Sequence, residues 1–142
     1  MVKEHDIVVD LYRHELAAAE IYQDVLKYIE DAKVKSKLQE IADDHRNHSK
    51  LLFKLAAKTG NKPIEMKNIK GTLLLGYASV ISMAEGQEGA LKAIQTTENM
   101  VLKKYKEASN NRKIYSKDIR AIVQNHLKDE ERYKNYMDIH IT

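Results

Sequence analysis

Four stretches of the chain repeat hydrophobic residues at alternating spacings of three and four, which is typical of one buried face of a helix. They lie at about residues 4–30, 33–58, 88–108 and 117–138. The five glycines and the single proline all fall between residues 60 and 89, while the flanking stretches are rich in Ala, Leu, Glu, Lys and Gln, which favour helices. We therefore predict two helical hairpins, with turns near residues 30–33 and 109–112.

The segment between the hairpins is expected to connect them as a crossover. Residues 60–63 (Gly-Asn-Lys-Pro) should end the second helix, and residues 72–84 predict a short apolar helix before Gly86 and Gly89. The crossover has to climb about 40 Å, the length of a helix of about 27 residues. The predicted fold is all-α: a single domain over residues 1–142, built as an up-down-down-up four-helix bundle with a short crossover helix between helices 2 and 3.

Each hydrophobic stripe is interrupted near its middle by polar residues that can bind metal. The interruptions are Glu15, the pair His45 and His48, Glu98, and the pair His126 and Asp129. In the last stretch, the predicted stripe is Ile119, Ile122, His126, Asp129, Tyr133 and Tyr136. Within each hairpin, the glutamate and the pair lie at similar distances from the predicted turn. Because the helices of a hairpin run antiparallel, we expect all six side chains to meet at one level in the core.

The two hairpins also share their polar spacing. Glu15 precedes Tyr22 by the same interval that separates Glu98 from Tyr105, which suggests a pseudo-twofold duplication of one hairpin. We expect both tyrosines to be core residues whose hydroxyl groups reach a polar partner.

Three explanations of the polar layer stay open from the sequence. An uncompensated buried ion costs several kcal/mol, against a typical total stability of about 5–15 kcal/mol, so the six groups have to be satisfied. A metal ion would do this, because carboxylates and imidazoles are ligands of Fe, Mn and Zn. Protonated histidines paired with the carboxylates would do it without metal. The third possibility is that the stripes are assigned in the wrong phase.

The arrangement resembles the ferritin-like superfamily, in particular rubrerythrin-type proteins and small bacterial ferritin-like bundles of unassigned function. Members carry a glutamate on helices 1 and 3 and a Glu-x-x-His pair on helices 2 and 4, which together hold two iron or manganese ions. Glu15 and Glu98 match the single glutamates, and His48 matches the histidine of the first pair. The resemblance covers nearly the whole chain.

The remaining positions depart from that pattern. His45 and His126 stand where the family has glutamate, and Asp129 stands where it has histidine. A rearranged two-metal site, a single nitrogen-rich site suited to Zn or Fe(II), and a site without metal therefore stay open. The resemblance implies a metal-binding protein with iron as the cofactor (manganese or zinc as alternatives), acting as an iron-dependent oxidoreductase, in peroxide handling or in metal storage.

The amino-acid composition excludes some classes of partner and some kinds of site. The net charge of +3 comes from scattered lysines and there is no Trp, so we expect no nucleic-acid partner. No apolar run approaches the roughly 18 residues of a membrane span, and no secretory signal is visible, so a cytoplasmic location is the expectation. The chain has no cysteine and hence no thiolate site. The apolar residues 72–84 are a candidate homodimer interface.

Other polar residues near the stripes are expected at the surface. Those beside the candidate ligands are Asp43, Asp44, Glu130 and Glu131, and the histidines outside the stripes are His5, His14 and His140. The alternative to a metal protein is a metal-free bundle that acts as a structural or stress-associated interaction protein.

Overall fold

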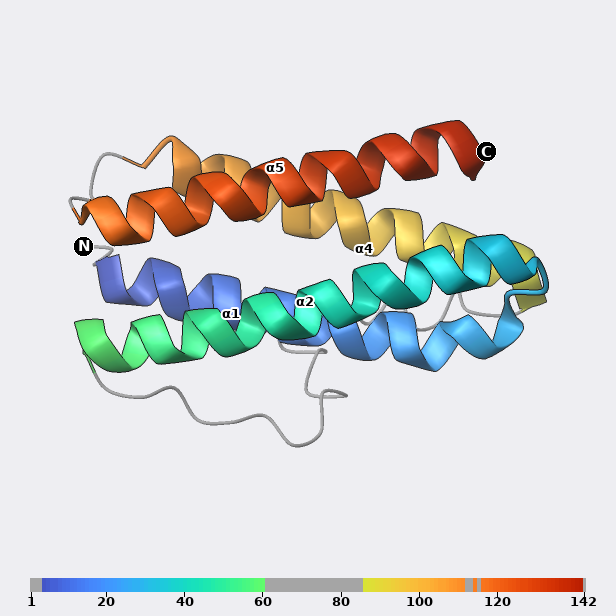
Figure 1. The fold of residues 1–142 in the computed structure, drawn as a ribbon, viewed down its shortest axis with the longest axis horizontal. Helices are drawn as coiled ribbons and strands as arrows, with labels where there is room; N and C mark the ends of the chain where they lie inside the picture. The colour runs from blue at the N-terminus through green and yellow to red at the C-terminus, as the bar shows by residue number, and fades with distance from the viewer. Residues whose placement is uncertain (1–3, 61–85, 112–113, 115, 142) are drawn as a thin grey trace.

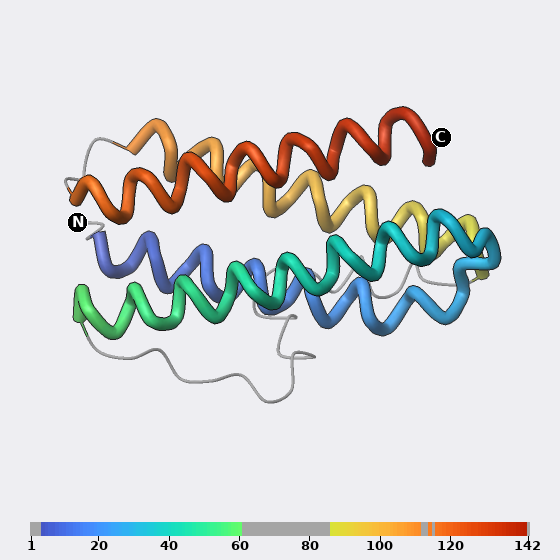
Figure 2. Tube along the Cα trace, viewed as in Figure 1, coloured from blue at the N-terminus to red at the C-terminus, as the bar shows by residue number. Residues whose placement is uncertain are grey.

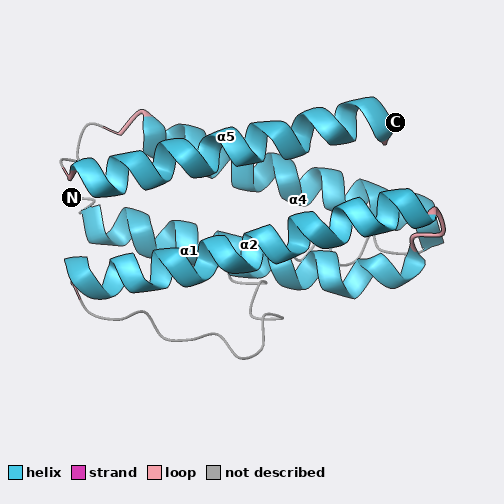
Figure 3. Ribbon diagram, in the orientation of Figure 1, coloured by secondary structure: helices cyan, strands magenta, loops and turns pink. Residues whose placement is uncertain are grey.

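The structure of the protein, a computed structural model, describes residues 4–60, 86–111, 114 and 116–141. Its helices are α1 (Glu4–Val25), continued by the short 3₁₀ helix η1 (Leu26–Tyr28), α2 (Ala32–Thr59), α4 (Gly86–Ser109) and α5 (Lys117–His140). Figure 3 shows helices and connecting loops, with no strand among the described residues. The prediction of an all-α four-helix bundle is confirmed.

The helices run in the predicted directions. Figures 1 and 2 show α1 and α5 running one way along the bundle and α2 and α4 the other, so their order is up-down-down-up. Helix α1 packs against both α2 and α4, and α5 packs against α4 and α2. The predicted crossover helix at residues 72–84, with its candidate dimer interface, lies outside the described residues. No described helix is both long and apolar enough to cross a membrane.

The turn between α1 and α2 is fixed by side-chain hydrogen bonds. The Asp31 carboxylate accepts from the backbone N–H groups of Lys33 and Val34 at 2.9 and 3.1 Å, which caps the start of α2. The backbone N–H groups of Glu30 and Asp31 both donate to the side chain of Gln87 at the start of α4. The first hairpin is thereby tied to the beginning of the second.

The apolar core is divided into two clusters. One includes Ile21, Val25, Leu38, Ile41, Ile94 and Met137, and the other includes Leu11, Leu52, Val101, Tyr105, Ile119 and Val123. Along each helix, the predicted polar residues fall between members of the two clusters. The polar layer therefore lies in the middle of the bundle, with hydrophobic packing on both sides.

Helix α5 buries a different stripe from the predicted one. Prediction and structure agree on Ile119, His126 and Tyr133, but the intervening buried residues are Val123, Glu130 and Met137 in place of Ile122, Asp129 and Tyr136. Adjacent residues on a helix point about 100° apart. The predicted and observed stripes have every second residue in common, and at the positions between these they differ by one residue. This one-residue difference changes which carboxylate α5 presents to the core.

Candidate metal centre

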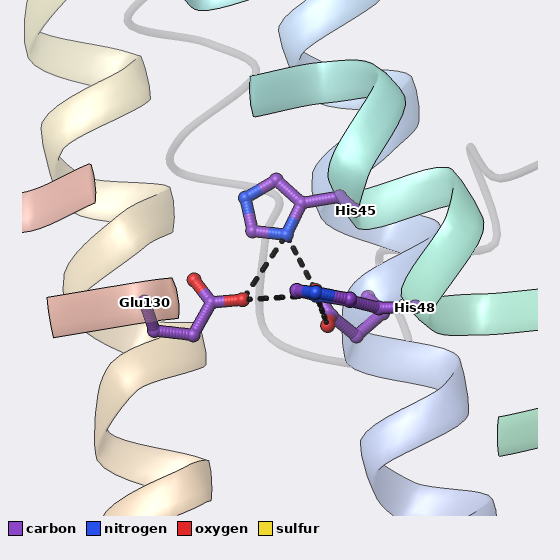
Figure 4. A group of neighbouring side chains, drawn as sticks. His45, His48 and Glu130 are labelled. Atoms are coloured by element: carbon purple, nitrogen blue, oxygen red, sulfur yellow. Dashed lines mark hydrogen bonds and ion pairs between the residues drawn. The ribbon is translucent and has the colours of Figure 1, made fainter. Parts of the chain in front are cut away.

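Four side chains from three helices converge in the polar layer. They are Glu15 of α1, His45 and His48 of α2, and Glu130 of α5. Each offers one ligand atom, and these atoms all lie within 4.8 Å of one another. Figure 4 shows His45, His48 and Glu130 directed toward a common point. Glu15, His45 and Glu130 are fully buried, and His48 is 8% exposed. Such a group could hold a metal ion.

Both histidines have the same orientation in the group. Each Nδ1 faces inward: that of His45 is hydrogen-bonded to Glu15 Oε1, and that of His48 lies 2.6 Å from Glu15 Oε2. Each Nε2 faces outward onto another carboxylate. His45 Nε2 is 2.9 Å from Glu98 Oε2, and His48 Nε2 is 3.0 Å from Asp129 Oδ2. Every ring nitrogen of the pair is therefore matched to a carboxylate.

Two buried tyrosines hold the glutamates of the layer. The Tyr105 hydroxyl donates to Glu15 Oε2 at 2.7 Å, and the Tyr22 hydroxyl donates to Glu98 Oε2 at 2.5 Å. The expectation that both tyrosines are core residues with a polar partner is confirmed. Burial and the neighbouring carboxylates raise the pKa of both hydroxyls well above the ordinary value, so they stay protonated donors.

Glu130 is the unsatisfied member of the group. Within the described part of the chain, neither of its carboxylate oxygens has a hydrogen-bond partner. The Nδ1 atoms of His45 and His48 lie 3.4 and 3.6 Å from Glu130 Oε1, close enough for electrostatic contact only. Burial and the nearby Glu98 and Glu15 carboxylates raise the pKa of Glu130 well above its ordinary value. Buried polar groups in proteins almost always have a partner, so this carboxylate requires an explanation.

His45 is protonated at neutral pH when no metal is bound. Burial alone would lower the pKa of its imidazole, but the Glu98 and Glu15 carboxylates outweigh that effect and raise the pKa to about 10. For Glu15, burial would raise the pKa, and the two histidines lower it well below the ordinary value. Without metal, a protonated His45 therefore lies between two ionised carboxylates at neutral pH.

The other predicted site residues surround the group of four. Glu98, 1% exposed, lies on the far side of His45, and Asp129, whose side chain is 34% exposed, lies on the far side of His48. His126 stacks on His48 with ring centroids 3.9 Å apart, and burial together with that neighbour lowers its pKa to about 4. All six predicted residues thus meet in one layer, with three of them in the group of four.

Two predictions about surface residues are wrong. Glu130 was expected in solvent but is fully buried, because α5 turns the stripe containing Val123 and Met137 toward the core. The sequence contains one signal for the observed stripe: Met137 is more apolar than its neighbour Tyr136. His14 was expected at the surface but is 4% exposed, because α1 buries a second line of residues beside its main stripe.

The comparisons with known proteins give one match. A family model described as a domain of unknown function (DUF2383) matches residues 4–111. The matched part contains α1, α2 and α4, and with them Glu15, His45, His48 and Glu98. No curated protein and no solved structure matches the chain.

Proposed function

The chain belongs to the DUF2383 family, and because that description states no activity, we propose a function from the site itself. The protein binds one divalent transition-metal ion through Glu15, His45, His48 and Glu130. Two imidazole nitrogens and two carboxylate oxygens suit Fe²⁺, Mn²⁺ and Zn²⁺. With neutral histidines, the two carboxylate charges are balanced by one divalent ion, so no net charge would be left among these groups.

The observation that carries this proposal is the buried Glu130 carboxylate. Pairing among histidines and carboxylates satisfies Glu15, but it leaves both Glu130 oxygens without a hydrogen bond in the described residues. Burying a polar group without a partner costs about 1–3 kcal/mol, and more when it is charged. A cation between Glu130 and the two inward Nδ1 atoms would supply the missing partner.

The surrounding residues support metal binding by orienting the ligands. When His45 and His48 present their Nδ1 lone pairs inward, each Nε2–H donates to a carboxylate, Glu98 or Asp129. This arrangement fixes the ring tautomer and makes the imidazole a better ligand. The Tyr105 hydroxyl holds Glu15 Oε2 in the same way. The ligands are therefore positioned before any ion arrives.

We propose iron as the metal, with manganese and zinc as alternatives. A bound iron or manganese ion would supply one-electron redox chemistry, which the ferritin-like resemblance links to iron oxidation, peroxide handling or storage. The four-helix bundle is consistent with that resemblance. His45 occupies a position where the family has a glutamate, and an imidazole does not bridge two metals as a carboxylate does. This difference favours a single ion.

Metal binding is testable on protein purified without a histidine tag. After loading with Fe²⁺ under anaerobic conditions, or with Mn²⁺ or Zn²⁺, elemental analysis should find about one ion per chain. Co²⁺ should give the visible absorption bands of a low-coordinate nitrogen and oxygen site. Absence of retained metal under all these conditions would reject the proposal.

Replacing Glu130 gives the sharpest variant. Glu130→Gln removes a ligand charge but keeps the shape of the side chain, and we expect metal affinity to fall about 10–100-fold or more. Glu131→Gln is the matched control because Glu131 is the next residue and is exposed. Equal affinities in the two variants would exclude Glu130 as a ligand.

A metal-free interaction protein is the second candidate, and the ion pairs of His45 with Glu15 and Glu98 favour it. In that case the polar layer would serve only to specify the fold. Replacing His45 and His48 together with apolar residues would then maintain or raise stability, because buried ion pairs are often no better than hydrophobic packing. Added metal would not change the unfolding temperature of the unaltered protein.

A further inference from the structure

A hollow of about 350 Å³ lies between α4 and α5, directly over the polar layer. Its lining residues are Lys92, Gln95, Thr96, Glu98, Asn99, Lys134, Met137 and Asp138. Only Glu98 and Met137 among them are buried, so these two form the floor and the others form the walls and rim. The hollow therefore leads from solvent toward Glu98 of the polar layer, whose buried side chain closes its floor.

The two oxygens of Glu98 are in different situations. Oε2 accepts from the Tyr22 hydroxyl and lies 2.9 Å from His45 Nε2, which fixes the carboxylate in place. Oε1 is buried and has no hydrogen-bond partner among the described residues. Beside the floor of the hollow there is thus a held carboxylate with one buried oxygen that lacks a hydrogen bond, an arrangement suited to a cation.

Unpartnered oxygens occur both beside this floor and at the candidate metal centre. The buried side-chain atoms without a hydrogen bond in the described residues are Glu98 Oε1 and the two oxygens of Glu130. Glu130 Oε1 is already 3.4 Å from the inward nitrogen of His45. Glu98 lines the hollow, Glu130 belongs to the candidate centre, and the two carboxylates are close enough to interact electrostatically.

Two other hollows among the described residues do not reach the polar layer. One of about 340 Å³ between α1 and α4 is lined by residues that include Asp6, Asp10 and Glu107, and another lies between the start of α2 and the end of α5. Neither contains Glu98 or any of the four candidate ligands. Among these hollows, the one between α4 and α5 alone has a residue of the layer in its lining.

We propose that a divalent cation enters the centre through the hollow between α4 and α5, with Glu98 Oε1 as a transient ligand that passes the ion to Glu130. This inference rests on the proposed metal-binding function. A cation that leaves water needs replacement oxygens along its path, and a carboxylate on that path lowers the barrier to entry and to exit. At the rim, Lys134 is paired with Asp138 at 3.3 Å, which weakens its repulsion of the ion.

Blocking the hollow tests the route without touching a ligand. Asn99 is exposed and lines the hollow, so Asn99→Trp should narrow it while leaving the centre intact. Stopped-flow experiments with Zn²⁺ or Co²⁺ would measure the rates. We expect the association and dissociation rate constants both to fall about tenfold or more, which is within the range that mutations produce in association rates. Because both rate constants fall together, Kd should stay unchanged. Glu107→Trp is the matched control, because Glu107 is on the same helix and lines the similar-sized hollow between α1 and α4.

Glu98→Gln tests the transient ligand. Glutamine still offers an oxygen to Tyr22 and His45, so the fold should hold, as circular dichroism would verify. We expect a slower association rate than in the unaltered protein. A Kd raised only through faster dissociation, at an unchanged association rate, would overturn the transient role and leave Glu98 with only the hydrogen bond by which it orients His45.

The outcomes separate the two proposals. Unchanged rates in Asn99→Trp, with normal Kd, would overturn the route and leave metal binding standing. Slower metal association and dissociation in Glu107→Trp alone would place the entrance between α1 and α4, and would also overturn the proposed route between α4 and α5. If the unaltered protein takes up no Zn²⁺ or Co²⁺ at equilibrium, the metal-binding function fails and the route fails with it.

Discussion

At the scale of single residues, the polar layer is organised around two imidazoles, each held between carboxylates. His45 lies between Glu15 and Glu98, and His48 lies between Glu15 and Asp129. The same contacts suit a doubly donating, protonated ring and a neutral ring that donates outward and binds metal inward. What distinguishes the two states is Glu130: without metal, its raised pKa makes it a protonated carboxyl beside Glu98 and Glu15, whereas with metal it would be an ionised ligand.

Tyr105→Phe should weaken this layer in a defined way. The variant removes the hydroxyl that donates to Glu15 Oε2 at 2.7 Å. We expect metal affinity to fall about 10–100-fold, as for other groups that orient ligands, and the metal-free protein to lose about 1–3 kcal/mol. Isothermal titration and urea unfolding would measure the two effects. Tyr28→Phe is the control, since Tyr28 is 38% exposed, and an equal loss there would contradict the assignment.

At the scale of elements, sequence patterning predicted α1, α2 and α4 better than α5. In the first three helices, the polar residues of the predicted stripe, Glu15, His45, His48 and Glu98, are all buried. In α5, Ile122 and Val123 are both apolar, and Asp129 and Glu130 are both acidic. The pattern therefore fits two stripes that differ by one residue, and only packing against α2 and α4 selects between them. That choice replaced Asp129 by Glu130 in the group of four.

The phase of α5 can be checked by truncating adjacent side chains. Met137 is 2% exposed, whereas Tyr136 is half-buried. Met137→Ala should cost about 2–5 kcal/mol, because it removes buried methylene groups and leaves a cavity. Tyr136→Ala should cost clearly less despite deleting the larger side chain. Chemical denaturation of both variants would decide, and the opposite order would restore the predicted stripe that contains Asp129.

At the scale of the whole molecule, the bundle has two apolar clusters separated by a layer that responds to pH. Without metal, the pKa of His45 is about 10 in the folded state and near 6.5 when unfolded, so the folded protein holds the proton more tightly. The resulting stability is fully present below pH 6.5 and is lost as the pH rises toward 10. Metal has the opposite dependence, because it must displace that proton to bind His45.

The increase in unfolding temperature on adding metal should therefore grow with pH. A ligand present at 100 times its Kd stabilises the folded state by about 2.7 kcal/mol. Between pH 6.5 and 9 the Kd for metal should fall, because less free energy is needed to deprotonate His45. At a fixed metal concentration, the stabilisation therefore increases with pH. Calorimetry with and without Zn²⁺ at several pH values would measure this, using a non-chelating buffer. His45→Gln should reduce the pH dependence, because glutamine carries no proton in this range, while His48 and Glu130, whose pKa values are also raised, account for the remainder. A metal effect that is independent of pH would mean that the ion binds away from His45.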